Sequence, residues 1–176
     1  MPAFLVTGNP GSGKSALAQE LARRGLATLD PDYDPELSYW EDDAGNRVLR
    51  VDGPPAPDRE WLRAHHWVWS RSRMEELLGQ QDGPVFVCGI ALNLDQFLDL
   101  FDQVFLLQID EVTQEARLVA YDERNPPGRS EADRQQIREG RTVFEAQIAS
   151  LGAIALDGTA PTTSVADDLL AHVSAC

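Results

Sequence analysis

Residues 8 to 15, GNPGSGKS, combine the residue types and the spacing of a phosphate-binding loop. The pattern Gly8-x-x-x-x-Gly13-Lys14-Ser15 places glycines where a backbone must turn tightly and direct N–H groups at phosphate oxygens. Lys14 would reach the β and γ phosphates of a nucleotide, and the Ser15 hydroxyl would bind magnesium. We therefore predict that ATP and Mg²⁺ bind at Gly8, Asn9, Pro10, Gly11, Ser12, Gly13, Lys14 and Ser15.

The sequence on both sides of this loop agrees with that prediction. The apolar residues 4 to 6 before it are typical of a strand, and SALAQELARR after it contains strong helix formers. The loop would then lie at a helix N-terminus, where the helix dipole favours anions. Lys14 is also the only lysine among the 15 basic residues of the chain, so the rare residue type falls at the position that needs it.

Two carboxylates follow the second predicted strand. Asp30 and Asp32 are two residues apart, so in an extended segment both side chains would face the same side, near the magnesium and the acceptor hydroxyl. One of them, with Asp32 as our choice, would hold the metal directly or through water, and the other would accept the proton of the attacking alcohol. For the later acidic residues, 34 to 43, we expect a solvated loop. The aromatic residues Tyr33, Tyr39 and Trp40 could equally stack on a substrate or anchor this loop.

Arginines provide the second source of positive charge. Six of the 15 basic residues lie between residues 117 and 141. We predict that residues 124 to 130 form a short lid in which Arg124 and Arg129 neutralise the transferring phosphoryl group, with Arg117 also on the nucleotide. The other three arginines could pair with acidic neighbours on an exposed helix or assist the lid; they are Arg134, Arg138 and Arg141.

Two further groups of residues allow more than one interpretation. Asp110 and Glu111 follow an apolar run, as in ATPase motors, but Asp110 with Thr113 after it also fits a helix N-cap, which we favour. His65 and His66 have no acidic or cysteine partner at metal-ligand spacing, so we expect them to pack with aromatic residues beside the acceptor rather than to bind metal.

Composition restricts the partners. The chain has 176 residues, of which 29 are acidic and 15 basic, and this net charge of −14 argues against nucleic acid or an anionic membrane surface. The two cysteines, Cys88 and Cys176, suggest neither a disulfide framework nor a metal site, so we expect a reduced, cytoplasmic setting. No apolar run reaches the length of a membrane span, and no signal peptide precedes the first strand. We expect a monomer or a homodimer.

Apolar runs that alternate with helical segments predict the fold that positions these residues. We predict a single domain, 1–176, with an α/β three-layer α/β/α architecture and a five-stranded parallel sheet. The expected strands are 3–7, 26–29, 84–88, 103–109 and 153–156, and the expected helices are 14–24, 58–79, 93–100, 111–123, 131–150 and 164–174. Residues 30–57 and 125–130 are expected loops at the carboxyl edge of the sheet, where such folds bind ligands, and the acceptor region would span about 30–79.

The whole pattern resembles the small phosphate-loop (P-loop) kinases related to shikimate, gluconate and adenylate kinases, and in particular bacterial ATP-binding, nucleoside-kinase-like proteins. The resemblance rests on the phosphate loop, the D-x-D after strand two, Gly89 in place of an acid after strand three, the arginine lid and LDGTAP near the C-terminus. It implies that the adenine lies near Asp157, Gly158, Thr159 and Pro161.

The chain also departs from these kinases. CGIALN at residues 88–93 lacks both the acid and the arginine that nucleoside monophosphate kinases carry in D-G-x-P-R, and only Arg63, Arg71 or Arg73 could replace that arginine. Asp122 and Glu123 stand where an arginine is expected before Asn125. We therefore predict ATP-dependent phosphoryl transfer to a hydroxyl of a small molecule, such as a nucleoside or another neutral or cationic alcohol. The alternatives are a nucleoside monophosphate kinase and an ATPase or regulatory module that uses Asp110 and Glu111.

Overall fold

The computed structural model describes residues 1–49, 59–120 and 131–174. Five parallel strands form the central sheet in the order β2-β6-β1-β7-β8. The strands are β1 (Ala3–Thr7), β2 (Ala27–Leu29), β6 (Val85–Cys88), β7 (Gln103–Gln108) and β8 (Ile154–Asp157). The predicted five-stranded parallel sheet is confirmed, with strand ends within one or two residues of those expected.

Alternation along the strands divides the apolar side chains between two cores. In β1, Leu5 belongs to one core and Phe4 and Val6 belong to the other. The same division holds in β6 and β7, because successive side chains of a strand point to opposite faces. Both faces of the central strands are therefore buried, as a parallel sheet covered by helices requires.

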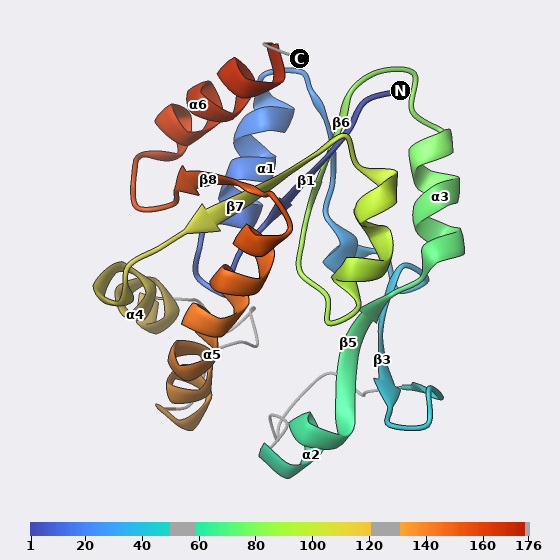
Figure 1. The fold of residues 1–176 in the computed structure, drawn as a ribbon, viewed down its shortest axis with the longest axis vertical. Helices are drawn as coiled ribbons and strands as arrows, with labels where there is room; N and C mark the ends of the chain where they lie inside the picture. The colour runs from blue at the N-terminus through green and yellow to red at the C-terminus, as the bar shows by residue number, and fades with distance from the viewer. Residues whose placement is uncertain (50–58, 121–130, 175–176) are drawn as a thin grey trace.

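Helices cover both faces and make three layers (Figure 1). On one face, α1 (Lys14–Arg23) and α6 (Thr162–Ser174) supply Leu17 and Leu169 to the core. On the other face lie α3 (Arg71–Gly79), the 3₁₀ helix η2 (Leu94–Leu100) and the C-terminal half of α5 (Glu131–Ser150). The remaining helix of the central domain, α4 (Glu111–Ala120), follows β7 at the carboxyl edge of the sheet. None of the described helices combines the length and the apolar character that crossing a membrane requires.

The predicted helix over 58–79 is wrong. The chain forms α2 (Arg59–Ala64), then strand β5 (His65–Trp69), and α3 starts after Ser70, whose hydroxyl accepts a hydrogen bond from the Arg73 N–H. The aromatic and β-branched residues of HHWVW suit an extended chain, which a partner strand can then stabilise.

That partner lies in the segment expected to be an irregular loop. β3 (Ser38–Asp42) pairs antiparallel with both β5 and the short β4 (Arg47–Val48), which gives a second sheet of order β4-β3-β5. This sheet and α2 project below α3 and the central sheet in Figure 1. Two smaller differences are the 3₁₀ helix η1 (Pro31–Tyr33) and the 3₁₀ rather than α-helical form of residues 94–100.

Candidate functional site

The carboxyl end of β1 opens directly into the glycine loop. Gly13, the residue before α1, has a φ of 103°, a left-handed conformation that side chains rarely adopt. At Gly8, a Cβ atom would lie 2.6 Å from the Ser12 Oγ and 2.9 Å from the Leu107 carbonyl oxygen. Both glycines are therefore required by the shape of the loop, and the N-terminus of α1 remains open for an anion.

Lys14 lies over this loop. Its ammonium donates hydrogen bonds to the carbonyl oxygens of Gly8 at 2.7 Å and Asn9 at 3.2 Å. Burial lowers the pKa of Lys14 to about 8, against the opposing effects of the Asp32 and Asp30 carboxylates. The charge of Lys14 is thus held in surroundings that favour contact with an anion.

Asp30 and Asp32 lie near Lys14, but not in the extended segment that was expected. Pro31 starts η1, and Asp30 caps it by accepting a hydrogen bond from the Asp32 N–H at 3.1 Å. Desolvation raises the pKa of both carboxyl groups, and at Asp30 the Asp32 carboxylate raises it further. The Trp67 indole N–H, which donates to the Asp32 Oδ1 at 3.1 Å, opposes this rise. A raised carboxylate pKa is suited to a group that accepts a proton.

Strand β6 ends at the same edge without an acid. Cys88 is buried, and burial raises the pKa of its thiol to about 12, so it stays neutral. Gly89 follows, and a Cβ there would lie 2.7 Å from the Trp69 ring and 3.0 Å from Pro31. The small residue at this position lets β5 and the Asp30–Asp32 turn approach the sheet edge.

Helix α4 supports the glycine loop from outside. The buried Gln114 donates from Nε2 to the Pro10 carbonyl at 2.9 Å, and Arg117 Nη1 donates to the carbonyls of Gly11 and Ser12 at 3.3 and 3.1 Å. Arg117 was expected near the nucleotide, whereas Gln114 was not recognised. Its position three residues before Arg117, on the same helix face, was the available signal.

Asp110 is engaged as the N-cap of α4. Its carboxylate accepts hydrogen bonds from the Thr113 N–H at 2.7 Å and the Thr113 hydroxyl at 3.0 Å, and these hold the pKa of Asp110 below its usual value. The preferred interpretation as a cap is confirmed.

The later arginines form ion pairs. Arg134 and Arg138 pair with Glu115 and Glu131, and Arg141 donates to the Ile109 carbonyl at 2.6 Å. Arg124 and Arg129, with the rest of the predicted lid at 124–130, lie outside the described residues. Their role stays a prediction.

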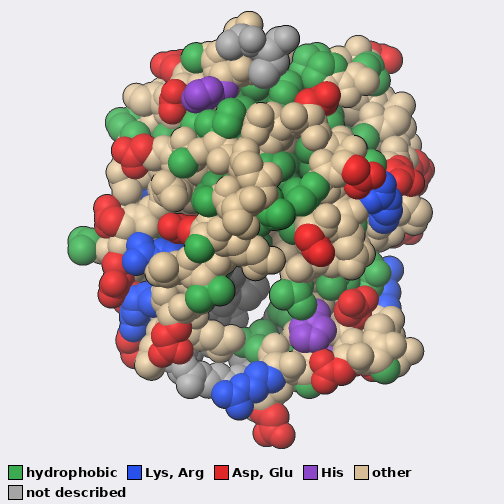
Figure 2. Space-filling view, in the orientation of Figure 1, with side chains coloured by type: hydrophobic (Ala, Val, Ile, Leu, Met, Phe, Trp, Pro, Cys, Tyr) green, Lys and Arg blue, Asp and Glu red, His purple; other side chains and the backbone are tan. Residues whose placement is uncertain are grey.

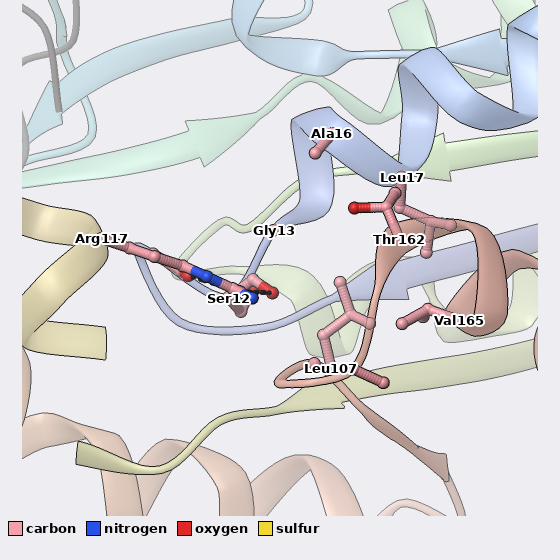
Figure 3. Close-up of a pocket in the computed structure, with 11 residues that line it drawn as sticks. Ser12, Gly13, Ala16, Leu17, Leu107, Arg117, Thr162 and Val165 are labelled. Atoms are coloured by element: carbon pink, nitrogen blue, oxygen red, sulfur yellow. Dashed lines mark hydrogen bonds between the residues drawn. The ribbon is translucent and has the colours of Figure 1, made fainter. Parts of the chain in front are cut away.

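A pocket of about 220 Å³ lies beside the glycine loop (Figure 3). Arg117 extends across it toward Ser12, and Leu107 and Val165 form part of an apolar wall. Gly158 lines it too, and its N–H donates to the Gln108 carbonyl at 2.7 Å.

Of the residues expected near adenine, Asp157 instead accepts hydrogen bonds from Thr159 in the turn, and Pro161 precedes α6. Ala160, within the segment 157–161 expected near adenine, lines the pocket as well, and the neighbours that sequence reasoning missed are Ala16, Leu17, Leu107, Thr162 and Val165.

The second sheet carries an aromatic cluster. The Trp40 ring packs 4.8 Å from Trp61 and 5.2 Å from Trp67, and His65 stacks on Trp61 at 4.0 Å between ring centroids. His66 lies 3.0 Å from the Asp43 carboxylate. The prediction that the histidines pack with aromatic residues is confirmed for His65. Trp40, one of the three residues whose role was open, anchors its segment.

The residues present fit a nucleotide with magnesium. The glycine loop supplies backbone N–H groups and one ammonium, and the buried Ser12 hydroxyl has no hydrogen-bond partner among the described residues. The part of the chain described here holds no cluster of three metal-binding side chains. Magnesium is usually held by one or two side chains together with phosphate oxygens and water, and Ser15 with Asp32 are the predicted ligands.

Comparisons with known proteins bear on the fold. No protein-family model matches the chain, and no curated protein matches it. Among solved structures, it is similar to a shikimate kinase from Acinetobacter baumannii, with a TM-score of 0.62 at 15% identity, over 99% of this chain and 94% of that one.

Two other solved structures are similar to the chain over nearly its whole length. A deoxyadenosine kinase from M. mycoides gives a TM-score of 0.57 at 13% identity, over 99% of this chain and 100% of that one. A gluconokinase from Sinorhizobium meliloti gives 0.53 at 18% identity, over 98% and 91%. At such identities the likeness concerns the fold, and this protein has the fold of the P-loop small-molecule kinases.

Proposed function

We propose that this protein transfers the γ-phosphoryl group of ATP to a hydroxyl of a small molecule, most readily a nucleoside or another neutral or cationic alcohol. The observation that carries the proposal is the position of Lys14. Its ammonium lies on the glycine loop at a helix N-terminus, within the electrostatic influence of Asp30 and Asp32. A phosphate-binding cation and two carboxylates of raised pKa are the groups that this reaction needs.

In the proposed reaction, the loop amides and Lys14 hold the polyphosphate. Ser15 and one of the two carboxylates, with Asp32 as our choice, would hold magnesium, which shields the phosphate charge when bound. The carboxylate that does not bind the metal, Asp30 if Asp32 is the ligand, accepts the proton of the acceptor hydroxyl. As the acceptor oxygen bonds to the γ-phosphorus, the bond from that phosphorus to the β–γ bridging oxygen breaks and ADP leaves. Lys14 and the predicted lid residues Arg124 and Arg129 stabilise the charge on the transferring group.

The charge distribution favours an alcohol acceptor over a nucleoside monophosphate. Of the three arginines that could bind an acceptor phosphate, Arg71 pairs with Glu75 and Asp99, and Arg73 pairs with Asp34 and Glu76. The guanidinium groups of Arg71 and Arg73 are therefore already neutralised by carboxylates, which leaves Arg63, an exposed residue of α2, as the remaining candidate.

The direct test is the Lys14→Ala substitution. It removes the ammonium that contacts the transferring phosphoryl group, so ADP release should fall by about a thousandfold or more with any acceptor. The acceptor screen comprises nucleosides, nucleoside monophosphates, sugars and aminoglycosides. Turnover that Lys14→Ala leaves undiminished would reject the proposal.

A paired assay separates the kinase from an ATPase that uses Asp110 and Glu111. Asp32→Asn should abolish acceptor-dependent ADP release. Asp110→Asn should leave turnover intact, because Asp110 caps α4 and asparagine caps a helix about as well as aspartate does. Loss of turnover in Asp110→Asn alone would favour the ATPase.

A further inference from the structure

A second pocket, of about 360 Å³, lies outside the nucleotide pocket. Its walls come from α2 and β5, from the turn after β6, and from the C-terminal half of α5. Figure 2 shows a hollow in the lower part of the molecule. In the same view of Figure 1, α4 and α5 lie on one side of this hollow and α2 and β5 lie on the other. The volume falls within the range of roughly 300–1,000 Å³ that is usual for small-molecule sites.

Two contacts connect this pocket to the proposed reaction centre. Trp67 lines the pocket, and its indole N–H donates the 3.1 Å hydrogen bond to Asp32. The turn that begins at Gly89 provides the second connection, because Gly89 lies against Pro31, between the two carboxylates, and the next residues, Ile90 to Leu92, line the pocket. A compound in this pocket therefore lies next to the two candidate catalytic carboxylates, Asp30 and Asp32.

The lining has a definite chemical character. Most of it is apolar or aromatic, with Leu62, Trp67, Ile90, Leu92 and Phe144 as its main contributors. Among the described lining residues no lysine or arginine occurs, and Asp95 is the one carboxylate. The two histidines of the lining are already engaged, His65 with the Trp61 carbonyl and His66 with the Asp43 carboxylate. Such a site favours a flat or bulky apolar group and disfavours an anion, because a phosphate or carboxylate would lose water without gaining a cationic partner.

We infer that this pocket binds the ring of the phosphoryl acceptor and selects a neutral compound with a planar heterocycle, of the nucleoside type, against phosphorylated or carboxylated compounds. The inference rests on the proposed function only in that the bound compound is then phosphorylated. Binding of the compound can be measured without turnover. In this arrangement the ring occupies the pocket and the hydroxyl points toward Asp32.

Binding can be measured by calorimetry on the full chain with Mg²⁺ and a non-hydrolysable ATP analogue, which fills the phosphate loop and prevents probes from binding there. The probes are the four common nucleosides, their 5′-monophosphates and gluconate. At least one nucleoside should bind, and about tenfold or more tightly than its monophosphate and than gluconate. Absence of nucleoside binding up to millimolar concentrations, or tighter binding of the anions, would overturn the inference.

Two exposed positions locate the binding site. Leu92→Asp places a charge in the pocket wall and should weaken nucleoside binding about tenfold, whereas Val143→Asp, a matched change at an exposed apolar residue that does not line the pocket, should leave it unchanged. Equal effects of the two substitutions, with both variants folded by circular dichroism, would contradict the assignment.

Asp95→Arg gives an independent test of the same inference. It can be used even if the Leu92→Asp variant does not fold. Replacing the carboxylate by a guanidinium should tighten the binding of nucleoside monophosphates at least severalfold, since the pocket then contains a phosphate partner. Unchanged monophosphate affinity would contradict the inference. Nucleoside binding without ADP release would support this pocket and count against the proposed phosphoryl transfer, so the two failures are distinguishable.

Discussion

Lys14 carries its charge in surroundings that disfavour it. Burial lowers its pKa to about 8, and its hydrogen bonds go to carbonyl oxygens of Gly8 and Asn9 that offer no full negative charge. Polyphosphate would supply that charge and raise the pKa again. Binding of a nucleotide would therefore offset the unfavourable free energy of burying the Lys14 ammonium.

ATP affinity should accordingly fall as the pH rises above about 8, the pKa of Lys14, because the free protein then loses the ammonium proton that the phosphates need. Calorimetry near pH 8 in buffers of different ionisation enthalpy should show proton uptake on binding. The Lys14→Arg variant keeps its charge and is the control; the same proton uptake in that variant would contradict the assignment to Lys14.

Trp67 tunes Asp32 through a single hydrogen bond. Its indole N–H lowers the pKa of a carboxyl group that desolvation raises. Trp67→Phe keeps an aromatic ring but removes the donor, so the pKa of Asp32 should rise further and the acidic limb of the kcat profile should move to higher pH.

The control for this substitution is Trp40→Phe, which changes a ring that packs on Trp67. A pH profile that shifts equally in both variants would show a packing effect. An unshifted limb in Trp67→Phe would show that turnover does not depend on the ionisation of Asp32.

At the level of elements, α4 holds the phosphate loop through side chains rather than through its own N-terminus. Gln114 and Arg117, one turn apart, donate to three successive loop carbonyls, those of Pro10, Gly11 and Ser12. These bonds hold the three carbonyls toward α4, which suits the proposed role of the loop amides in binding phosphate.

Gln114→Met retains the size of the side chain and removes the hydrogen bond to the Pro10 carbonyl. The free energy of unfolding should fall by about 1 kcal/mol, and KM for ATP should rise more than kcat falls, because the loop loses an outside support. Urea denaturation and steady-state kinetics measure both effects. Gln135→Met, an exposed glutamine on α5, is the control and should change neither, and an unaltered KM in Gln114→Met would refute the supporting role.

The whole molecule consists of a doubly covered parallel sheet and a smaller antiparallel sheet that carries the aromatic cluster. Strands β1, β6 and β7 are buried on both faces, whereas β3 and β4 are mainly half-buried or exposed. The two sheets meet where Asn93, in the turn after β6, exchanges two 3.0 Å hydrogen bonds with the Trp69 backbone of β5.

Amide hydrogen exchange should therefore be slowest in β1, β6 and β7 and faster in β3 and β4, since local opening of the small sheet exposes fewer buried contacts. Mass spectrometry of peptides across the chain measures this order. In Asn93→Ala, exchange in β5 should increase by about tenfold while β1 stays unchanged. Uniform exchange across both sheets would mean that they open as one unit.

The sequence by itself determined the phosphate loop and the central fold. The loop is a local feature, because close approach at Gly8, left-handed backbone at Gly13 and a following helix are encoded within a few residues of one another. The buried strands β1, β6 and β7 were equally predictable, since apolar runs that are covered on both faces tolerate few other arrangements.

Only the tertiary structure decided how the acceptor side is built. The residues HHWVW are compatible with a helix or a strand, and their pairing with Ser38–Asp42, which lies more than 20 residues away, selected the strand. Pro31 turned the Asp30–Asp32 segment into a capped 3₁₀ turn, and Gln114 met the loop only because β7 lies beside β1. Contacts between residues distant in the chain depend on how the layers pack, which residue spacing alone does not specify.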